Sequence, residues 1–432
     1  MMSKDMFIIG FMLFALFFGA GNLIYPPVLG AEAGTSFVAA MTGFIITGIG
    51  LPIIAVTAIS YVKNDARELG NHVHPLFGLL FTCLVYLAIG PFFGIPRAAT
   101  VGYEMSVKPF LTDTSTQGLW LFTTIFFLAT FLVSLNPSKL VDRIGQYLTP
   151  ILFLAITILV IGGFAFFDQP LANPTGGYQD TPFFTGFIEG YLTMDAIAAL
   201  AFGIIVVNTF KEKGITSRNA VILSTLKAGL VAGIGLIAVY ASIGWLGAKF
   251  TEGEAYTNGG EILAQAASTL FGTTGTLLLG VIVTLACFTT SVGLVVATAQ
   301  FFSKIIPLAY PWIASIITLI SYLIANQGLD SIIRFSVPVL IFLYPIAIVL
   351  ILLTFIHPLF KGRKAVYRGA IIFTSIFSLN DGLNELSVSL PYISNYITLL
   401  PLFDHGLGWV LPACVGGCIG YLVSITFSRS YS

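Results

Sequence analysis

FFGAGNLIYPP, at residues 17–27, interrupts the first apolar segment of the chain. That segment runs from about Met6 to Gly30, which is long enough for a helix to cross a hydrocarbon core of roughly 30 Å. Its middle is unsuited to a continuous helix, because Gly19 and Gly21 each cost about 1 kcal/mol relative to alanine and the Pro26-Pro27 pair lacks two backbone donors. Lipid supplies no water to the freed backbone groups, so such a break is stable only where it faces protein, a cavity or a bound polar ligand. The stretch therefore predicts a binding site, with a kinked structural helix as the alternative.

The composition of the chain indicates its class. Of 432 residues, 57% are hydrophobic and only 9% are charged, which is typical of an all-α, polytopic membrane protein and leaves little room for a soluble enzyme. The formal net charge is zero and no basic patch occurs, so nucleic acid is not an expected partner. Membrane lipid is the expected surrounding, and the oligomeric state stays open.

Twelve apolar segments separated by polar connections predict twelve transmembrane helices. They lie near residues 6–30, 37–61, 76–106, 118–136, 144–167, 184–209, 219–247, 275–303, 308–326, 332–356, 366–380 and 408–427. Lysine and arginine concentrate in alternate connections, such as the one holding Lys211, Lys213 and Arg218, and near both ends of the chain. Because cytoplasmic loops of membrane proteins carry the excess of these residues, both termini are expected in the cytoplasm.

A second interrupted helix is predicted in span six, where Asp195 lies at mid-membrane depth within EGYLTMDAIAALAFG at residues 189–203. An ionised aspartate there costs about 2.5 to 3.5 kcal/mol unless it meets a cation, a proton or water. The alternative is a structural hydrogen bond to a neighbouring helix. Breaks five spans apart, in segments of opposite predicted orientation, favour an inverted repeat within one transporter domain, residues 1–432. Repeat one covers about 6–167, repeat two about 184–356, and the additional helices about 366–427.

Span eight carries consecutive hydroxyl side chains at Thr289, Thr290 and Ser291. Such hydroxyls usually donate to carbonyls of the preceding turn of their own helix. Thr289 and Thr290 can instead offer neutral oxygen ligands to a weakly held monovalent cation, together with carbonyls of a broken helix.

Three stretches resemble one family of transporters. GAGNLIYPP at residues 19–27, GPFFGIPRAAT at residues 90–100 and SLNDG at residues 378–382 are similar to the bacterial branched-chain amino acid:cation symporter family, within the amino acid-polyamine-organocation superfamily. The resemblance implies the five-plus-five inverted-repeat fold of the bacterial leucine transporter, with helices one and six broken. It also implies a multi-pass protein of the bacterial cytoplasmic membrane that takes up leucine, isoleucine and valine with sodium ions or protons and has no cofactor.

The resemblance further implies two sets of site residues. In that fold a sodium ion lies between spans one and eight, and the matching positions are the carbonyls of Ala15 and Phe18 with Ala286, Thr289 and Thr290. The substrate carboxylate would meet backbone N–H groups at the positive end of a half-helix. Those N–H groups belong to Ala20, Gly21 and Asn22. Leu16 stands where the bacterial leucine transporter has a polar residue at a further sodium site, so a second sodium ion is not expected. Arg97 is a candidate for a proton-linked or carboxylate role instead.

The predicted mechanism is alternating access around a mid-membrane site, in which the aliphatic side chain of the substrate enters an apolar pocket. The remaining candidate substrate-binding residues are Phe17, Phe92, Asp195, Ala196 and Ile197, with Phe18 and Phe93 as further candidate pocket walls. No phosphate-binding glycine loop for ATP occurs, so an ion gradient is the expected energy source. The rival predictions are a transporter of another small neutral amino acid, a channel and an intramembrane enzyme; the sequence offers neither rings of like charge nor a His-Glu-x-x-His motif.

Overall fold

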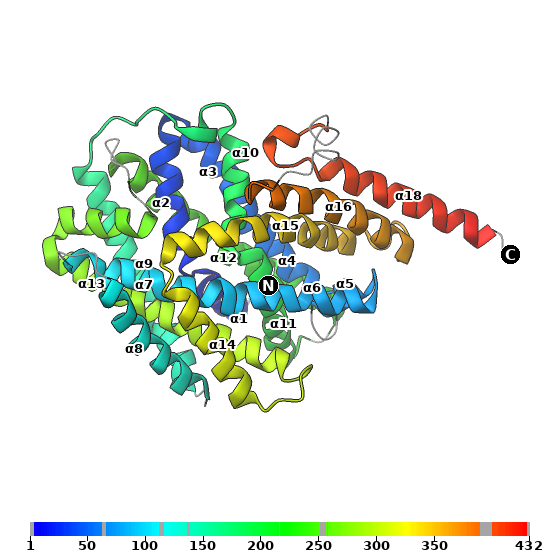
Figure 1. The fold of residues 1–432 in the computed structure, drawn as a ribbon, viewed down its shortest axis with the longest axis horizontal. Coiled ribbons are helices and arrows are strands. Elements are labelled where there is room, and N and C mark those ends of the chain that lie inside the picture. Colours follow the sequence, from blue (N-terminus) through cyan, green and yellow to red (C-terminus); the bar gives the residue numbers. More distant parts are fainter. Residues whose placement is uncertain are drawn as a thin grey trace. The chain divides into compact units, whose positions relative to one another are not determined.

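The computed structural model describes residues 4–62, 66–111, 116–135, 139–215, 217–250, 256, 258–388 and 400–429 (Figure 1). All regular structure in these ranges is helical, which confirms the predicted all-α class. The α-helices are α1 (Lys4–Phe17), α2 (Gly21–Ala33), α3 (Phe37–Ile45), α4 (Leu51–Ile59), α5 (Arg67–Asn71), α6 (Pro75–Leu87), α7 (Gly94–Ser106), α8 (Thr116–Leu135), α9 (Lys139–Phe166), α10 (Pro182–Glu189), α11 (Asp195–Glu212), α12 (Arg218–Phe250), α13 (Gly259–Phe302), α14 (Tyr310–Ala325), α15 (Leu329–Ile356), α16 (Lys364–Glu385) and α18 (Val410–Arg429). Short 3₁₀ segments are η1 (Gly34–Ser36), η4 (Lys108–Phe110), η5 (Gly176–Tyr178), η6 (Gly190–Thr193) and η7 (Phe403–His405), and η2 (Ile46–Gly50) and η3 (Ala88–Phe92) are π-helical.

Six continuous helical stretches of the described chain are long and apolar enough to cross a membrane. They are Gly21–Ile59, Pro75–Phe110, Thr116–Leu135, Arg218–Phe250, Gly259–Ser303 and Leu329–Ile356. The pair Pro182–Thr193 and Asp195–Glu212, bent by 45°, makes a seventh if it is counted as one span. Shorter apolar helices, such as Met6–Phe17 and Tyr310–Ala325, lie within other predicted spans. The chain is thus a multi-pass membrane protein, and the count of twelve spans stays a prediction.

The chain divides into two compact units. Unit one comprises Met1–Ile49, Tyr86–Met194 and Leu230–Arg334; unit two comprises Gly50–Val85, Asp195–Gly229 and Phe335–Ser432. Helices α6, α12 and α15 contribute residues to both units. An inverted repeat is a relation of symmetry rather than of contact, so the predicted division into two repeats also stays a prediction.

In unit one, α2 contacts its neighbours through glycines. A Cβ on Gly30 would lie 1.7 Å from the carbonyl oxygen of Gly244 in α12. A Cβ on Gly259, the first residue of α13, would lie 1.9 Å from the carbonyl oxygen of Ile24. Main chain therefore touches main chain at these crossings, as small residues permit between helices in membranes. Helices α3 and α10 meet in the same way, because a Cβ on Gly186 would lie 2.0 Å from the carbonyl oxygen of Ala40.

In unit two, α16 and α18 lie side by side (Figure 1). A Cβ on Gly416 would lie 2.3 Å from the carbonyl oxygen of Gly369, and a Cβ on Gly420 would lie 2.1 Å from that of Ala365. Gly416 and Gly420 are four residues apart, so they occupy one face of α18 and bring the two backbones together.

Replacing Gly416 with alanine is expected to push α16 and α18 apart, since an overpacked contact costs about 1–3 kcal/mol. The midpoint of thermal unfolding of the purified protein in detergent should fall by several degrees. Gly417→Ala is the matched control, because a Cβ there meets the Ala370 Cβ at an ordinary 3.7 Å. Equal midpoints for the two variants would show that this glycine contact does not hold the helices together.

Several helices are interrupted where the predicted site residues lie. Helix α1 ends at Phe17 and α2 begins at Gly21. Gly90, within η3, has a non-helical backbone, with φ −86° and ψ −118°. Met194, between η6 and α11, has the left-handed φ of 65°, which non-glycine residues rarely adopt. Such irregularities free backbone groups for other partners.

Candidate functional site

The interruption between α1 and α2 leaves donors at the N-terminus of α2. The Asn22 side-chain amide donates to the carbonyl of Phe17, which ties the two helix ends together. The Asn22 N–H donates to the carbonyl of Gly19 at 3.2 Å. In the part of the chain that the structure describes, no backbone carbonyl accepts from the N–H groups of Ala20 and Gly21. Two of the three predicted carboxylate-binding N–H groups are therefore not engaged by the backbone, whereas the third has an acceptor.

The guanidinium of Arg97 lies against this helix terminus. Arg97 is buried, with 3% of its surface exposed. Its Nη1 donates to the carbonyl of Leu192 at 2.7 Å and to the hydroxyl of Tyr25 at 3.3 Å, and its Nη2 donates to the carbonyl of Thr193 at 3.0 Å. The Leu192 and Thr193 carbonyls belong to η6, the segment just before Met194. Arg97 thus connects the interruption after α1 with the one before α11.

The local sequence places Arg97 in the first turn of α7. Its N–H donates to the carbonyl of Phe93 at 2.9 Å, directly after the π-helical η3. A Cβ on Gly94 would lie 1.9 Å from the carbonyl oxygen of Ile89, so only glycine permits the chain to turn this tightly from η3 into α7. Pro91 is compatible with this irregular segment, because a regular helix would need the N–H that proline lacks.

One of the predicted cation ligands on α13, Thr290, is near the same interruption. The Thr289 and Thr290 hydroxyls both donate to the carbonyl of Ala286, at 2.9 Å and 3.0 Å. In this structure both hydroxyls therefore donate within their own helix, as hydroxyl side chains in helices usually do. Each hydroxyl oxygen keeps lone pairs that can coordinate a cation. A Cβ on Gly19 would lie 3.9 Å from the Thr290 Cγ2, so the side chain of Thr290 is beside the interruption.

The other predicted side chains have different surroundings. Phe17 and Phe18 are buried, at 2% and 5% exposure, whereas Phe92 is 40% exposed. Asp195, Ala196 and Ile197 are buried residues at the start of α11, in unit two. Among the residues that the structure covers, no group of three or more His, Cys, Asp and Glu side chains is arranged to hold a metal.

The partners of Arg97 could not be foreseen from the sequence. A lone arginine in an apolar segment signals a functional residue. Two of its acceptors are backbone carbonyls, however, which carry no residue-type signal. Tyr25 is four residues beyond the first residue of α2, and nothing in the residue types indicates that its hydroxyl accepts from Arg97.

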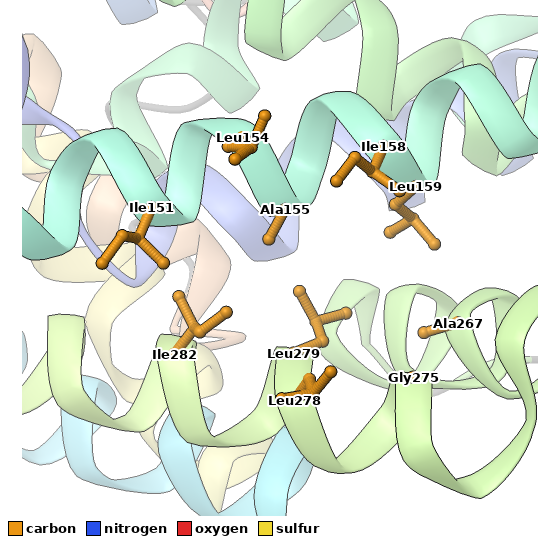
Figure 2. Close-up of a pocket in the computed structure, with 10 residues that line it drawn as sticks. All are labelled: Ile151, Leu154, Ala155, Ile158, Leu159, Ala267, Gly275, Leu278, Leu279 and Ile282. Carbon is orange, nitrogen blue, oxygen red and sulfur yellow. The ribbon is translucent and has the colours of Figure 1, made fainter.

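A groove between α9 and α13 is separate from these polar groups. It has a volume of about 250 Å³. Figure 2 shows Ile151, Leu154 and Ile158 of α9 across from Leu278, Leu279 and Ile282 of α13. The groove is lined by aliphatic side chains and glycine, so it offers no side-chain hydrogen bonds to a zwitterion.

A family model described as "Branched-chain amino acid transport protein" matches residues 2–427. The chain belongs to this family. Two relatives of this chain come from Bacillus subtilis (strain 168). Branched-chain amino acid permease BraB is 47% identical over 431 residues, which are 99% of this chain and 97% of the relative. Branched-chain amino acid permease BrnQ is 46% identical over 423 residues, which are 97% and 96% of the two chains. The family predicted from the three sequence stretches is therefore confirmed.

The fold of the chain is similar to that of Mhp1, which is described as a nucleobase-cation-symport-1 family transporter. The closed conformation with bromovinylhydantoin bound has a TM-score of 0.63 at 14% identity, with 98% of this chain and 93% of that chain covered. The inward-facing conformation has a TM-score of 0.64 at 13% identity, with 97% and 91% covered. The TM-scores show a shared fold. At sequence identities this low, the likeness says nothing about a shared substrate.

Proposed function

We propose that this protein is a secondary symporter that takes up leucine, isoleucine and valine, driven by a gradient of sodium ions or protons. Its family and the permease names of its relatives support the substrate class. The observation that carries the proposal is the interruption between α1 and α2. There the N–H groups of Ala20 and Gly21 have no backbone acceptor among the described residues, and the buried Arg97 guanidinium lies alongside. A helix N-terminus with free N–H groups favours an anion, here the carboxylate of an amino acid.

The proposal includes the architecture of twelve spans with two inverted repeats of five and with spans one and six broken. The likeness to Mhp1 supports it, because that likeness extends over 98% of the chain. The lysine and arginine distribution supports a cytoplasmic location of both termini. The bacterial permease relatives support the bacterial cytoplasmic membrane as the location.

The three substrates fit one site on physical grounds. Leucine, isoleucine and valine share the same charged groups and differ by single methylenes or their placement. An apolar pocket distinguishes one methylene by only about 1 to 3 kcal/mol. Phe17 and Phe18 directly precede the interruption that holds these N–H groups, and both side chains are buried, so they are the proposed apolar neighbours of the substrate side chain.

For the coupling ion we propose a site formed by the carbonyls of Ala15 and Phe18 with Ala286, Thr289 and Thr290. The residue types support a hard monovalent cation, which prefers oxygen ligands. The adjacency of Thr290 and Gly19 supports the pairing of α13 with the interruption. The proton is the second candidate for the coupling ion, and uptake driven by a sodium gradient alone or by a pH gradient alone distinguishes it from sodium.

Counterflow in proteoliposomes tests the transport mechanism. Vesicles loaded with unlabelled leucine should accumulate labelled leucine transiently, because a carrier exchanges the two across the membrane. A channel would show no stimulation by internal leucine, and stimulation by internal alanine alone would indicate another small neutral amino acid. Uptake is then measured with a sodium gradient alone and with a pH gradient alone; activity under neither condition would overturn the symport proposal.

Replacing Asp195 with asparagine is expected to lower the rate of leucine uptake at least tenfold or to shift its pH profile. The amide keeps the size of the side chain but cannot carry a negative charge. Initial rates are compared between about pH 5.5 and pH 8, with Glu212→Gln at the exposed end of α11 as the control. Wild-type rates across this range would leave Asp195 with a structural hydrogen bond only.

A further inference from the structure

We propose that the guanidinium of Arg97 binds the α-carboxylate of the substrate directly, through its Nε–H edge, next to the N–H groups of Ala20 and Gly21. This inference rests on the proposed function, because it names the side chain that recognises the carboxylate at the same site. It makes a positively charged side chain, and not the helix terminus alone, the source of selectivity for amino acids over derivatives that lack the carboxylate.

The first observation is the charge of Arg97. All three groups that accept from its terminal nitrogens are uncharged, namely the carbonyls of Leu192 and Thr193 and the hydroxyl of Tyr25. Among the side chains that the structure describes, the ion pair present is Lys108 with Glu104 at 2.7 Å, and no carboxylate lies within 4.0 Å of the Arg97 nitrogens. A buried cation without a counter-charge is unfavourable in a low-dielectric region. An anionic ligand would neutralise it.

The second observation is an unused donor. Arg97 Nε is buried and has no hydrogen-bond partner within the described chain. Nη2 carries two hydrogens, and Thr193 accepts from this nitrogen once. In a guanidinium, Nε–H and one terminal N–H share an edge with the spacing of the two oxygens of a carboxylate. The edge that contains Nε therefore suits a two-point contact with a carboxylate.

The third observation is the position of this guanidinium against α2. A Cβ on Gly21 would lie 2.7 Å from Arg97 Nη2 and 3.1 Å from its Cζ. The N-terminus of a helix carries a partial positive charge, so a guanidinium beside it is repelled. The η6 carbonyls that accept from Arg97 offset part of that repulsion. A carboxylate that accepts from both the guanidinium and the free N–H groups would replace repulsion by attraction on both sides.

The test compares leucine with leucinamide, which has the same side chain and amino group but no negative charge. Binding of each to the purified protein is measured as ligand-induced thermal stabilisation and converted to a dissociation constant. The wild-type protein should prefer leucine by about 100-fold. Arg97→Gln should weaken leucine binding about 30-fold, as expected for the loss of charge-assisted hydrogen bonds, and change leucinamide binding less than threefold.

Two further variants keep the result interpretable. Arg97→Lys retains the charge but not the two-point edge, so the preference for leucine should fall about tenfold; it also serves as the test if Arg97→Gln does not fold. Tyr25→Phe removes one acceptor of Nη1 and leaves Nε in place. Any loss of affinity should therefore be equal for leucine and leucinamide, so that the ratio of their dissociation constants matches the wild type.

The outcomes separate this inference from the proposed function. Equal weakening of leucine and leucinamide in folded Arg97→Gln and Arg97→Lys would assign Arg97 a positioning role and overturn the inference. Equal affinity of the wild-type protein for the two ligands would overturn it as well, while leucine transport stands. Absence of any leucine binding or counterflow in the wild-type protein would instead refute the proposed function.

Discussion

Replacing Gly21 with alanine should reduce leucine uptake at least tenfold while the protein still folds. The added Cβ would lie 2.7 Å from Arg97 Nη2 and 3.1 Å from the carbonyl oxygen of Thr193. Arg97 cannot move away freely, because its two terminal nitrogens are held by hydrogen bonds to Leu192, Thr193 and Tyr25. Either these bonds are lost or α2 shifts, and a displacement of about 1 Å at a binding site can cost 100-fold in activity. Initial uptake rates in proteoliposomes, normalised to the amount of folded protein, give the effect.

Gly19→Ala is the matched control for this prediction. It adds the same methyl group two residues away, where the nearest atoms, the Phe17 carbonyl oxygen and the Thr290 Cγ2, are both at 3.9 Å. Uptake by this variant should stay within about threefold of the wild type. Equal loss of activity in both variants would indicate that any side chain in the interruption is harmful, and it would remove the specific role given to the contact between Gly21 and Arg97.

Replacing both Thr289 and Thr290 with valine should abolish stimulation of uptake by sodium. Valine has nearly the shape of threonine, and the hydroxyls lost donate only to the carbonyl of Ala286 in this structure, so the helix itself should persist. What disappears is a pair of oxygen ligands for the proposed cation. Leucine uptake is measured against sodium concentration at constant ionic strength. The uptake rate of the wild type should rise with sodium, whereas that of the valine variant should stay low at all sodium concentrations.

The double serine variant is the control, because serine keeps the hydroxyl and loses only the methyl group. It should retain sodium stimulation, with an apparent affinity for sodium within about tenfold of the wild type. Unchanged sodium stimulation in the valine variant would refute the assignment of these ligands. Uptake driven by a pH gradient alone in the wild type, without any effect of sodium, would favour the proton instead.

Composition and local motifs were sufficient for the broad features of this protein. High apolar content gave the all-α membrane class, and GPFFGIPRAAT with two other stretches gave the family. The glycines of FFGAGN predicted an interruption at the residues between the end of α1 and the start of α2. These properties depend on the chemistry of adjacent residues, which the sequence contains directly.

The remaining features depend on atoms that residue types do not reveal. The acceptors of Arg97 are main-chain oxygens of η6, nearly one hundred residues away in the sequence. The left-handed backbone of Met194 has no sequence signal, because such a conformation is normally associated with glycine or asparagine. Phe92, the last residue of η3, is 40% exposed, and the π-helical turn in which it lies has no signal in the residue types.

The glycine crossings of α2 limit how this helix can move. At Gly30 and Gly259 its neighbours approach to backbone distance, with no flexible side chain between them. Two helices separated by long side chains can slide, because those side chains can change rotamers. Two helices whose backbones touch have no such adjustable layer, so they keep one relative position. Within unit one, α2 therefore cannot slide along Gly244 or Gly259 without breaking these backbone contacts, so its first turn is held in one position relative to them.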